Sequence, residues 1–133
     1  MNGEAVGSVD PGPGLAARRV LVVEDNVDAA EALQMLLEFA GHEVRIAFDA
    51  RRGIDLAKSW RPHVILSDLG LPGGMDGYDL ARALGTELER PWTLVALSGY
   101  GRAEDKARAR EAGFDAHLTK PVEIEALERL LGQ

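Results

Sequence analysis

The sequence predicts a doubly wound α/β fold, in which a five-stranded parallel sheet of strand order 2-1-3-4-5 carries helices on both faces. The first observation behind this prediction is that short apolar runs alternate with longer segments of helical periodicity. The second is that these runs are almost wholly aliphatic and β-branched, as in parallel strands buried on both faces. Because crossovers between parallel strands are right-handed, few topologies are open to such units, and we expect this order.

Capping residues and helix breakers bound the elements of the first half. Asn26 can cap the first helix, because its side chain can accept a hydrogen bond from the helix N-terminus, and Gly41 can end that helix. Pro62 disfavours helical backbone in the residue before it and so ends the second helix. The expected elements are a strand over 20–23, a helix between Asn26 and Gly41, a strand over 43–48, a helix over 50–59 and a strand over 63–67.

The second half repeats the alternation after a turn at Pro72, Gly73 and Gly74. Leucines at 80, 84 and 88 recur every four residues and so share one helical face. Gly113 ends a more polar helix. The expected elements are a helix over 78–89, a strand over 92–97, a helix over 103–112, a strand over 115–118 and a helix over 122–131.

The composition indicates the domain organisation and argues against several classes of function. Residues 1–17 hold four glycines and two prolines and are expected to form a flexible tail or linker, whereas residues 18–133 form one domain. The net charge of −7 argues against direct nucleic-acid binding. The apolar runs are too short to cross a bilayer, so we expect no membrane insertion and a cytoplasmic location. Without cysteine, neither disulfides nor thiolate metal sites can form.

Carboxylates follow the first and third predicted strands. Glu24 and Asp25 come directly after the first strand, and Asp68 comes after the third. In doubly wound sheets, ligands bind beyond the carboxyl ends of the strands where the strand order reverses, here between strands one and three. Three like charges at one place require a cation, and Mg²⁺ prefers such oxygen ligands. The sequence therefore predicts a magnesium site, and the absence of paired histidines argues against zinc.

Two further polar groups follow the fourth and fifth strands. Ser98 can donate its hydroxyl hydrogen to a phosphoryl oxygen, and Gly99 leaves room for the ligand. Lys120 supplies a positive charge, and Pro121 after it can adopt a cis peptide bond. Together with a carboxylate nucleophile at Asp68 and Mg²⁺, these groups are the parts needed to form an aspartyl phosphate.

The ordered set of motifs resembles the receiver domains of two-component response regulators, which have the flavodoxin-like fold of chemotaxis regulators. The resemblance covers residues 18–131. It rests on Val22-Val23-Glu24-Asp25-Asn26, Ser67-Asp68-Leu69-Gly70-Leu71-Pro72, Met75-Asp76-Gly77-Tyr78, Ala96-Leu97-Ser98-Gly99 and Leu118-Thr119-Lys120-Pro121.

This resemblance implies a role for each residue at the strand ends. Asp68 would be the phosphoacceptor, Ser98 the switch hydroxyl and Lys120 a contact of the phosphoryl group. The Mg²⁺ ligands would be Glu24, Asp25, Asp68 and the backbone carbonyl of Gly70. The donor would be a phosphohistidine of a sensor histidine kinase or phosphotransfer protein, and the downstream protein is not implied. Such a domain catalyses its own phosphorylation and dephosphorylation, but acts mainly as a switch in a phosphorelay.

Two alternatives to this function stand beside it. A pseudo-receiver would bind proteins independently of phosphorylation, and the intact acidic set argues against it. An aspartate-nucleophile phosphatase usually has a second aspartate two residues after the nucleophile, where this chain has Gly70. The chain is compatible with a stand-alone regulator and with a receiver from a hybrid histidine kinase. The mixed-charge helix over 103–112 is a candidate partner surface.

Three departures from the family pattern stand out. The Gly73-Gly74 pair adds one residue to the loop after Asp68. His117 lies three residues before Lys120, where many receivers have a rotating Tyr or Phe, and we expect a half-buried packing or hydrogen-bonding histidine rather than a pH sensor. Glu24 replaces an aspartate and should still reach the metal or its water. Of the other two histidines, we expect His42 in a loop and His63 in a structural role.

Overall fold

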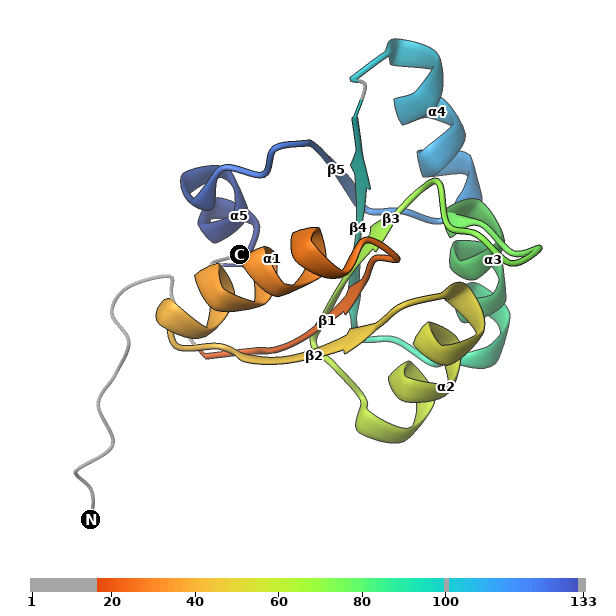
Figure 1. Ribbon diagram of the computed structural model, residues 1–133. Helices are drawn as coiled ribbons and strands as arrows, with labels where there is room; N and C mark the ends of the chain where they lie inside the picture. The colour runs from red at the N-terminus through yellow and green to blue at the C-terminus, as the bar shows by residue number, and fades with distance from the viewer. Residues whose placement is uncertain (1–16, 100, 132–133) are drawn as a thin grey trace.

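The computed structural model describes residues 17–99 and 101–131 and shows the predicted parallel sheet, with strand order β2-β1-β3-β4-β5 (Figure 1). The predicted tail lies outside the described residues, apart from Ala17. The strands are β1 (Arg19–Val23), β2 (Glu43–Ala47), β3 (Val64–Asp68), β4 (Thr93–Ser98) and β5 (Ala116–Thr119).

Helices cover both faces of this sheet, as expected from the mostly apolar strands β1, β3 and β4 (Figure 1). One face carries α1 (Val27–Phe39) and α5 (Ile124–Leu131), and the other carries α2 (Ala50–Trp60), α3 (Gly77–Glu87) and α4 (Ala103–Ala112).

The two faces hold separate hydrophobic clusters that draw on alternate residues of the same strands. Val20 and Val22 of β1 pack with α1 and α5, whereas Leu21 and Val23 pack with α2 and α3. This alternation is the two-residue period of a strand. These four of the five β1 side chains are fully buried, so the strand that leads into Glu24 is packed on both faces.

Caps that the sequence predicts at α1 are present in the structure. The Asn26 side chain accepts a hydrogen bond of 2.9 Å from the Ala29 N–H, and Gly41 has a φ of +98° just after the helix. A side chain at that φ would be strained, which explains the glycine.

The predicted bounds of α3 differ from the observed ones at both ends. The helix begins at Gly77, because Asp76 and Asp79 form a capping box with bonds of 3.1 and 3.0 Å. It ends at Glu87, and Leu88 is already extended. The indole N–H of Trp92 donates to the Glu89 carbonyl at 3.0 Å, which satisfies backbone beyond the helix end.

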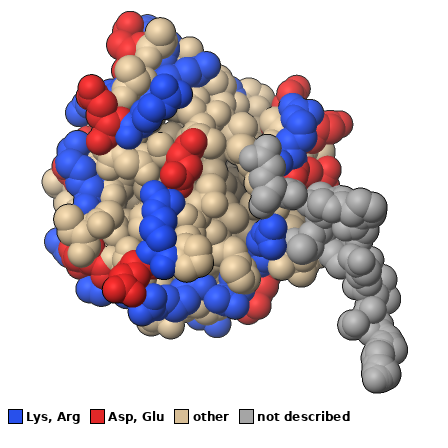
Figure 2. Space-filling model, turned by 180° about the vertical axis from the view of Figure 1, so that it is seen from behind, with Lys and Arg blue, Asp and Glu red and all other residues tan. Residues whose placement is uncertain are grey.

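Charged side chains of both signs are interspersed on the surface. Figure 2 shows Lys and Arg beside Asp and Glu on the face turned away from the viewer in Figure 1. No helix in the described part of the chain is long and apolar enough to span a membrane.

Two histidines hold the start of β1. His42 Nδ1 accepts a hydrogen bond of 3.1 Å from the Arg18 N–H, and His63 Nδ1 accepts one of 2.8 Å from the Arg19 N–H. The structural role expected of His63 is confirmed. His42 lies in the expected loop, between α1 and β2, but its side chain is buried. Both bonds require an Nδ1 atom that carries no hydrogen.

The His42 bond predicts a loss of stability in mild acid. Burial and the nearby charge of Arg18 lower the pKa of His42, and the charge of Glu128 only partly opposes this lowering. The unfolded chain therefore takes up this proton near pH 6.5 and the folded chain only at lower pH. The contribution to stability is complete above pH 6.5 and is lost as the pH falls below it.

Urea unfolding at several pH values between about 7.5 and 5 measures this contribution. His42→Asn is the matched control, because its amide oxygen can accept the same hydrogen bond and does not titrate. We expect the unaltered chain to lose about 1 kcal/mol more than this variant over that range. Parallel pH profiles for the two proteins would contradict the assignment.

Candidate functional site

The carboxyl ends of β1, β3, β4 and β5 lie at one edge of the sheet (Figure 1). Polar residues stand at these ends or directly after them. The strand order makes β1 and β3 neighbours, with β4 and β5 continuing outward from β3. Glu24 and Asp25 follow β1, whereas Asp68 and Ser98 are the last residues of β3 and β4. Lys120 directly follows β5, and its peptide bond to Pro121 is cis.

The three carboxylates predicted from the sequence lie together. Each of Glu24, Asp25 and Asp68 offers an oxygen atom within 4.8 Å of the others. Glu24 is buried, Asp68 is half-buried and Asp25 is exposed. The Asn26 N–H donates to Glu24 Oε2 at 3.0 Å, and the Gly70 N–H donates to Asp68 Oδ1 at 3.1 Å. Backbone groups therefore orient two of the three carboxylates.

Lys120 bridges two of these carboxylates. Its Nζ atom lies 2.6 Å from Glu24 Oε1 and 3.2 Å from Asp68 Oδ2. Burial of the ammonium group lowers the pKa of Lys120, but the hydrogen bond to Glu24 and the charge of Asp68 outweigh this effect. The net result is a pKa above the usual value of 10.5, so Lys120 stays charged at neutral pH.

The donor set fits Mg²⁺. Three carboxylates against one ammonium leave an excess of negative charge that a divalent cation can compensate. Hard oxygen ligands are those that Mg²⁺ prefers, and no histidine or cysteine belongs to this cluster among the described residues. The residues that could hold the ion are Glu24, Asp25 and Asp68. The role expected of the Gly70 carbonyl stays a prediction.

Close backbone packing positions Asp68. The Gly77 N–H donates to the Leu69 carbonyl at 2.9 Å, which brings the start of α3 against the end of β3. A Cβ atom at position 77 would lie only 2.4 Å from the Asp68 carbonyl oxygen and 2.7 Å from Leu69 Cα. Only glycine fits there without moving the backbone of Asp68. Gly77 is part of the sequence motif, but nothing in the sequence indicates that it packs against the backbone of Asp68.

Ser98 and His117 meet on adjacent strands. The Ser98 Oγ atom lies 2.8 Å from His117 Nε2, and the Ser98 carbonyl accepts a hydrogen bond of 2.7 Å from the Lys120 N–H. His117 is half-buried, which confirms the expectation of a half-buried hydrogen-bonding residue. The structure also identifies Ser98 as the hydrogen-bond partner of His117, which the sequence did not predict.

Comparison with known proteins shows the family of this chain. The family model for the response regulator receiver domain matches residues 20–131. The chain belongs to this family. A 14.6 kDa protein of Leptolyngbya boryana is 37% identical to this receiver over 121 residues, which are 90% of this chain and 91% of that protein.

Two solved receivers resemble it in structure. The receiver domain of a sensor histidine kinase from Pseudomonas aeruginosa has a magnesium ion coordinated in its active-site cleft. It superposes with a TM-score of 0.77 at 29% identity, over 87% of this chain and 95% of that one. A chain of the Saccharomyces cerevisiae complex between the phosphotransfer protein Ypd1 and the Ssk1 receiver superposes with a TM-score of 0.78. It is 28% identical, and the match covers 86% of each chain.

The loop after Asp68 in this receiver has an unusual backbone. Gly73 and Gly74 have φ values of +89° and +87°, which are strained for other residues. The sequence predicts that this pair adds one residue to the loop relative to the family pattern. The backbone explains why both positions hold glycine, and the effect of the loop on partner binding stays a prediction.

The packing of Gly77 predicts opposite effects for two glycine substitutions in the same helix. Gly77→Ala should destabilise the fold by roughly 1–3 kcal/mol, because the new methyl group overlaps the Asp68 backbone. Gly85→Ala is the matched control, since nothing lies within 4 Å of its Cβ position. It should stabilise the helix by roughly 0.5–1 kcal/mol. Urea unfolding measures both, and equal effects would show that Gly77 is not under steric constraint.

Proposed function

We propose that this receiver is a phosphorylation-controlled switch, in which Asp68 accepts a phosphoryl group in a Mg²⁺-dependent step. The donor is a phosphohistidine of a sensor histidine kinase or of a phosphotransfer protein. The observation that carries the proposal is the placement of Asp68 within one cluster with Glu24, Asp25 and Lys120. The Pseudomonas aeruginosa receiver that holds magnesium in its active-site cleft supports it.

Asp68 is the nucleophile in this transfer. A carboxylate oxygen of Asp68 attacks the phosphorus atom, the phosphorus–nitrogen bond of the phosphohistidine breaks, and the leaving nitrogen keeps the electron pair. The Gly70 N–H and the Lys120 ammonium group contact opposite oxygens of the carboxylate and fix its orientation before the attack. Phosphoryl transfer depends mainly on such positioning and on charge neutralisation.

Charge at the site is balanced by residues from several strands. Glu24, Asp25 and Asp68 would hold Mg²⁺, which would supply positive charge to offset the negative charge of the phosphoryl oxygens. Lys120 already lies 3.2 Å from Asp68 Oδ2 and can contact a phosphoryl oxygen on the same residue. Ser98 donates its hydroxyl hydrogen to another phosphoryl oxygen. The phosphorylated state is thereby favoured over the free state in a shift of a pre-existing equilibrium.

Position 70 supports a switch over an aspartate-nucleophile phosphatase. Hydrolysis of the aspartyl phosphate requires attack by water, and a nearby carboxylate would speed that attack. Two residues after Asp68 the chain has Gly70, which offers no such group. The chain therefore lacks the second aspartate that such phosphatases usually have at this position.

The partners follow from the same chemistry. The complex of Ypd1 with the Ssk1 receiver supports a phosphotransfer protein or kinase as the upstream partner. The net charge of −7 favours a protein rather than a nucleic acid downstream. We place this exchange in the cytoplasm, and we propose that residues 18–133 form the receiver and residues 1–17 a tail or linker.

Labelling with acetyl phosphate and Mg²⁺ tests the phosphoacceptor. Intact mass spectrometry should show the addition of one phosphoryl group to the unaltered chain and none to Asp68→Asn, which lacks the nucleophilic oxygen. Asp55→Asn, an exposed substitution on α2 with the same chemical change, is the control and should label normally. Undiminished labelling of Asp68→Asn would refute its role. No labelling of any protein would favour the phosphorylation-independent pseudo-receiver.

Magnesium titration tests the acidic cluster. Asp25→Asn should weaken Mg²⁺ binding by at least roughly tenfold, the loss that even outer-shell partners of a metal ligand typically cause. Glu43→Gln removes the same charge at the opposite edge of the sheet, where β2 begins, and should leave the affinity nearly unchanged. Equal losses of affinity for the two variants would show that the effect comes from the overall charge of the protein. Asp25 would then not be a Mg²⁺ ligand.

A further inference from the structure

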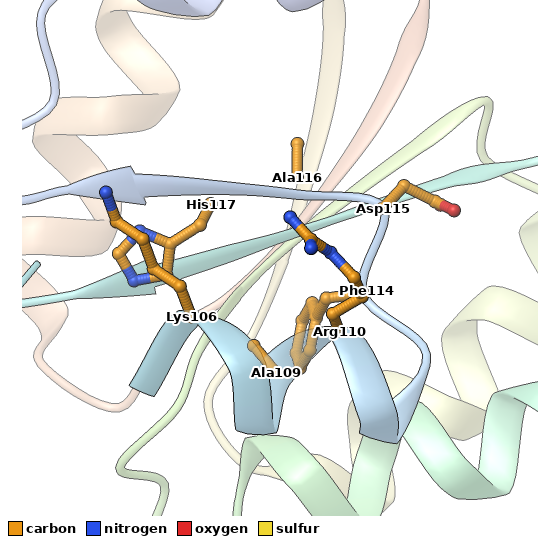
Figure 3. Close-up of a pocket in the computed structure, with 7 residues that line it drawn as sticks. All are labelled: Lys106, Ala109, Arg110, Phe114, Asp115, Ala116 and His117. Atoms are coloured by element: carbon orange, nitrogen blue, oxygen red, sulfur yellow. The ribbon is translucent and has the colours of Figure 1, made fainter. Parts of the chain in front are cut away.

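The ring of His117 has one satisfied and one unsatisfied nitrogen. Nε2 lies 2.8 Å from Ser98 Oγ, whereas Nδ1 is buried and has no hydrogen-bond partner among the described residues. Figure 3 shows the ring beside α4, in a pocket that it lines together with Lys106 and Arg110. Among the described residues, the contact with Ser98 is therefore the only hydrogen bond of this ring.

The unsatisfied Nδ1 indicates which nitrogen carries the hydrogen. A neutral imidazole has one N–H group and one bare nitrogen. If Nδ1 carried the hydrogen, a buried N–H donor would have no acceptor, which costs free energy. At His42 the Arg18 N–H forces this arrangement on the buried Nε2 atom. The Ser98 hydroxyl can either donate or accept and imposes no such constraint on His117. If Nε2 of His117 carries the hydrogen, the N–H donates to Ser98 Oγ and only a weaker acceptor is left without a partner. The geometry therefore favours the Nε2–H tautomer.

The surrounding charges agree with a neutral ring. Burial and the positive charge of Lys106 lower the pKa of His117, and the carboxylate of Asp105 opposes them only in part. Lys106, Asp105 and Arg110 face the ring from α4, and Ser98 faces it from β4. At neutral pH the ring is thus uncharged, and the choice between the two tautomers decides its role.

We infer that His117 is a positioning residue, which donates its Nε2–H to Ser98 Oγ and so directs the Ser98 hydroxyl hydrogen to a phosphoryl oxygen on Asp68. Because the ring donates in this hydrogen bond, the Ser98 hydroxyl does not donate its hydrogen to the ring. Donor and acceptor bonds at one hydroxyl also strengthen each other. This inference rests on the proposed function and adds a residue to it.

A double-mutant cycle tests the inference through the rate of labelling by acetyl phosphate with Mg²⁺. His117→Phe keeps a planar ring but has no donor, and should slow labelling roughly three- to tenfold, the value of one hydrogen bond. His117→Gln can place an amide N–H near Nε2 and should retain most of the rate. In a Ser98→Ala background, His117→Phe should have no further effect, because its route through Ser98 is gone.

A merely structural His117 gives a different result. His117→Phe would then slow labelling equally in the Ser98 and the Ser98→Ala backgrounds, and this would overturn the inference. No slowing by His117→Phe would overturn it as well. Failure of the unaltered chain to label would instead overturn the proposed function, and the role of His117 with it. The pattern across the cycle therefore separates the two failures.

The tautomer itself can be observed in the unaltered protein. A long-range proton–nitrogen correlation spectrum of the histidine rings shows which nitrogen carries the hydrogen. We expect the hydrogen of His117 on Nε2, with a change in that signal in Ser98→Ala. A hydrogen on Nδ1 would make the ring an acceptor of the Ser98 hydrogen and would overturn the inference, whatever the labelling rates.

Discussion

The contact of Lys120 with Glu24 and Asp68 is the interaction on which the rest of the site depends. Parallel strands bring the three carboxylates to one edge of the sheet, where their mutual repulsion opposes folding. The ammonium group, which comes from the end of β5, lies within 3.2 Å of two of them and partly offsets that repulsion. The buried Glu24 would otherwise be a costly uncompensated charge. The same arrangement leaves an excess of negative charge that suits a divalent cation.

Strand order and strand-end chemistry could be predicted from the sequence, because both depend on local patterns. Apolar runs mark the buried strands, and the residue after each run must lie at the carboxyl edge. This reasoning is sufficient to place Glu24, Asp68 and Lys120 together. It does not show which carboxylate Lys120 contacts more closely, since that depends on side-chain conformations across three strands.

The features that the sequence did not predict are contacts between distant segments. Gly77 belongs to a sequence motif, but the reason for glycine at this position is that the Asp68 backbone packs against the start of α3. The end of α3 is predicted too late for a local reason instead: Leu88 continues the four-residue leucine spacing, but its backbone is already extended. The three histidines also differ only in context: His42 and His63 accept backbone N–H groups, whereas His117 meets a side-chain hydroxyl.

Chemical trapping can identify the residue that carries the phosphoryl group, which we propose to be Asp68. Borohydride reduces an aspartyl phosphate to homoserine, which peptide mass spectrometry can locate in the chain after labelling with acetyl phosphate and Mg²⁺. We expect homoserine at position 68 alone, and none when Mg²⁺ is withheld. Homoserine at another carboxylate, such as position 25, or equal conversion without Mg²⁺, would contradict it.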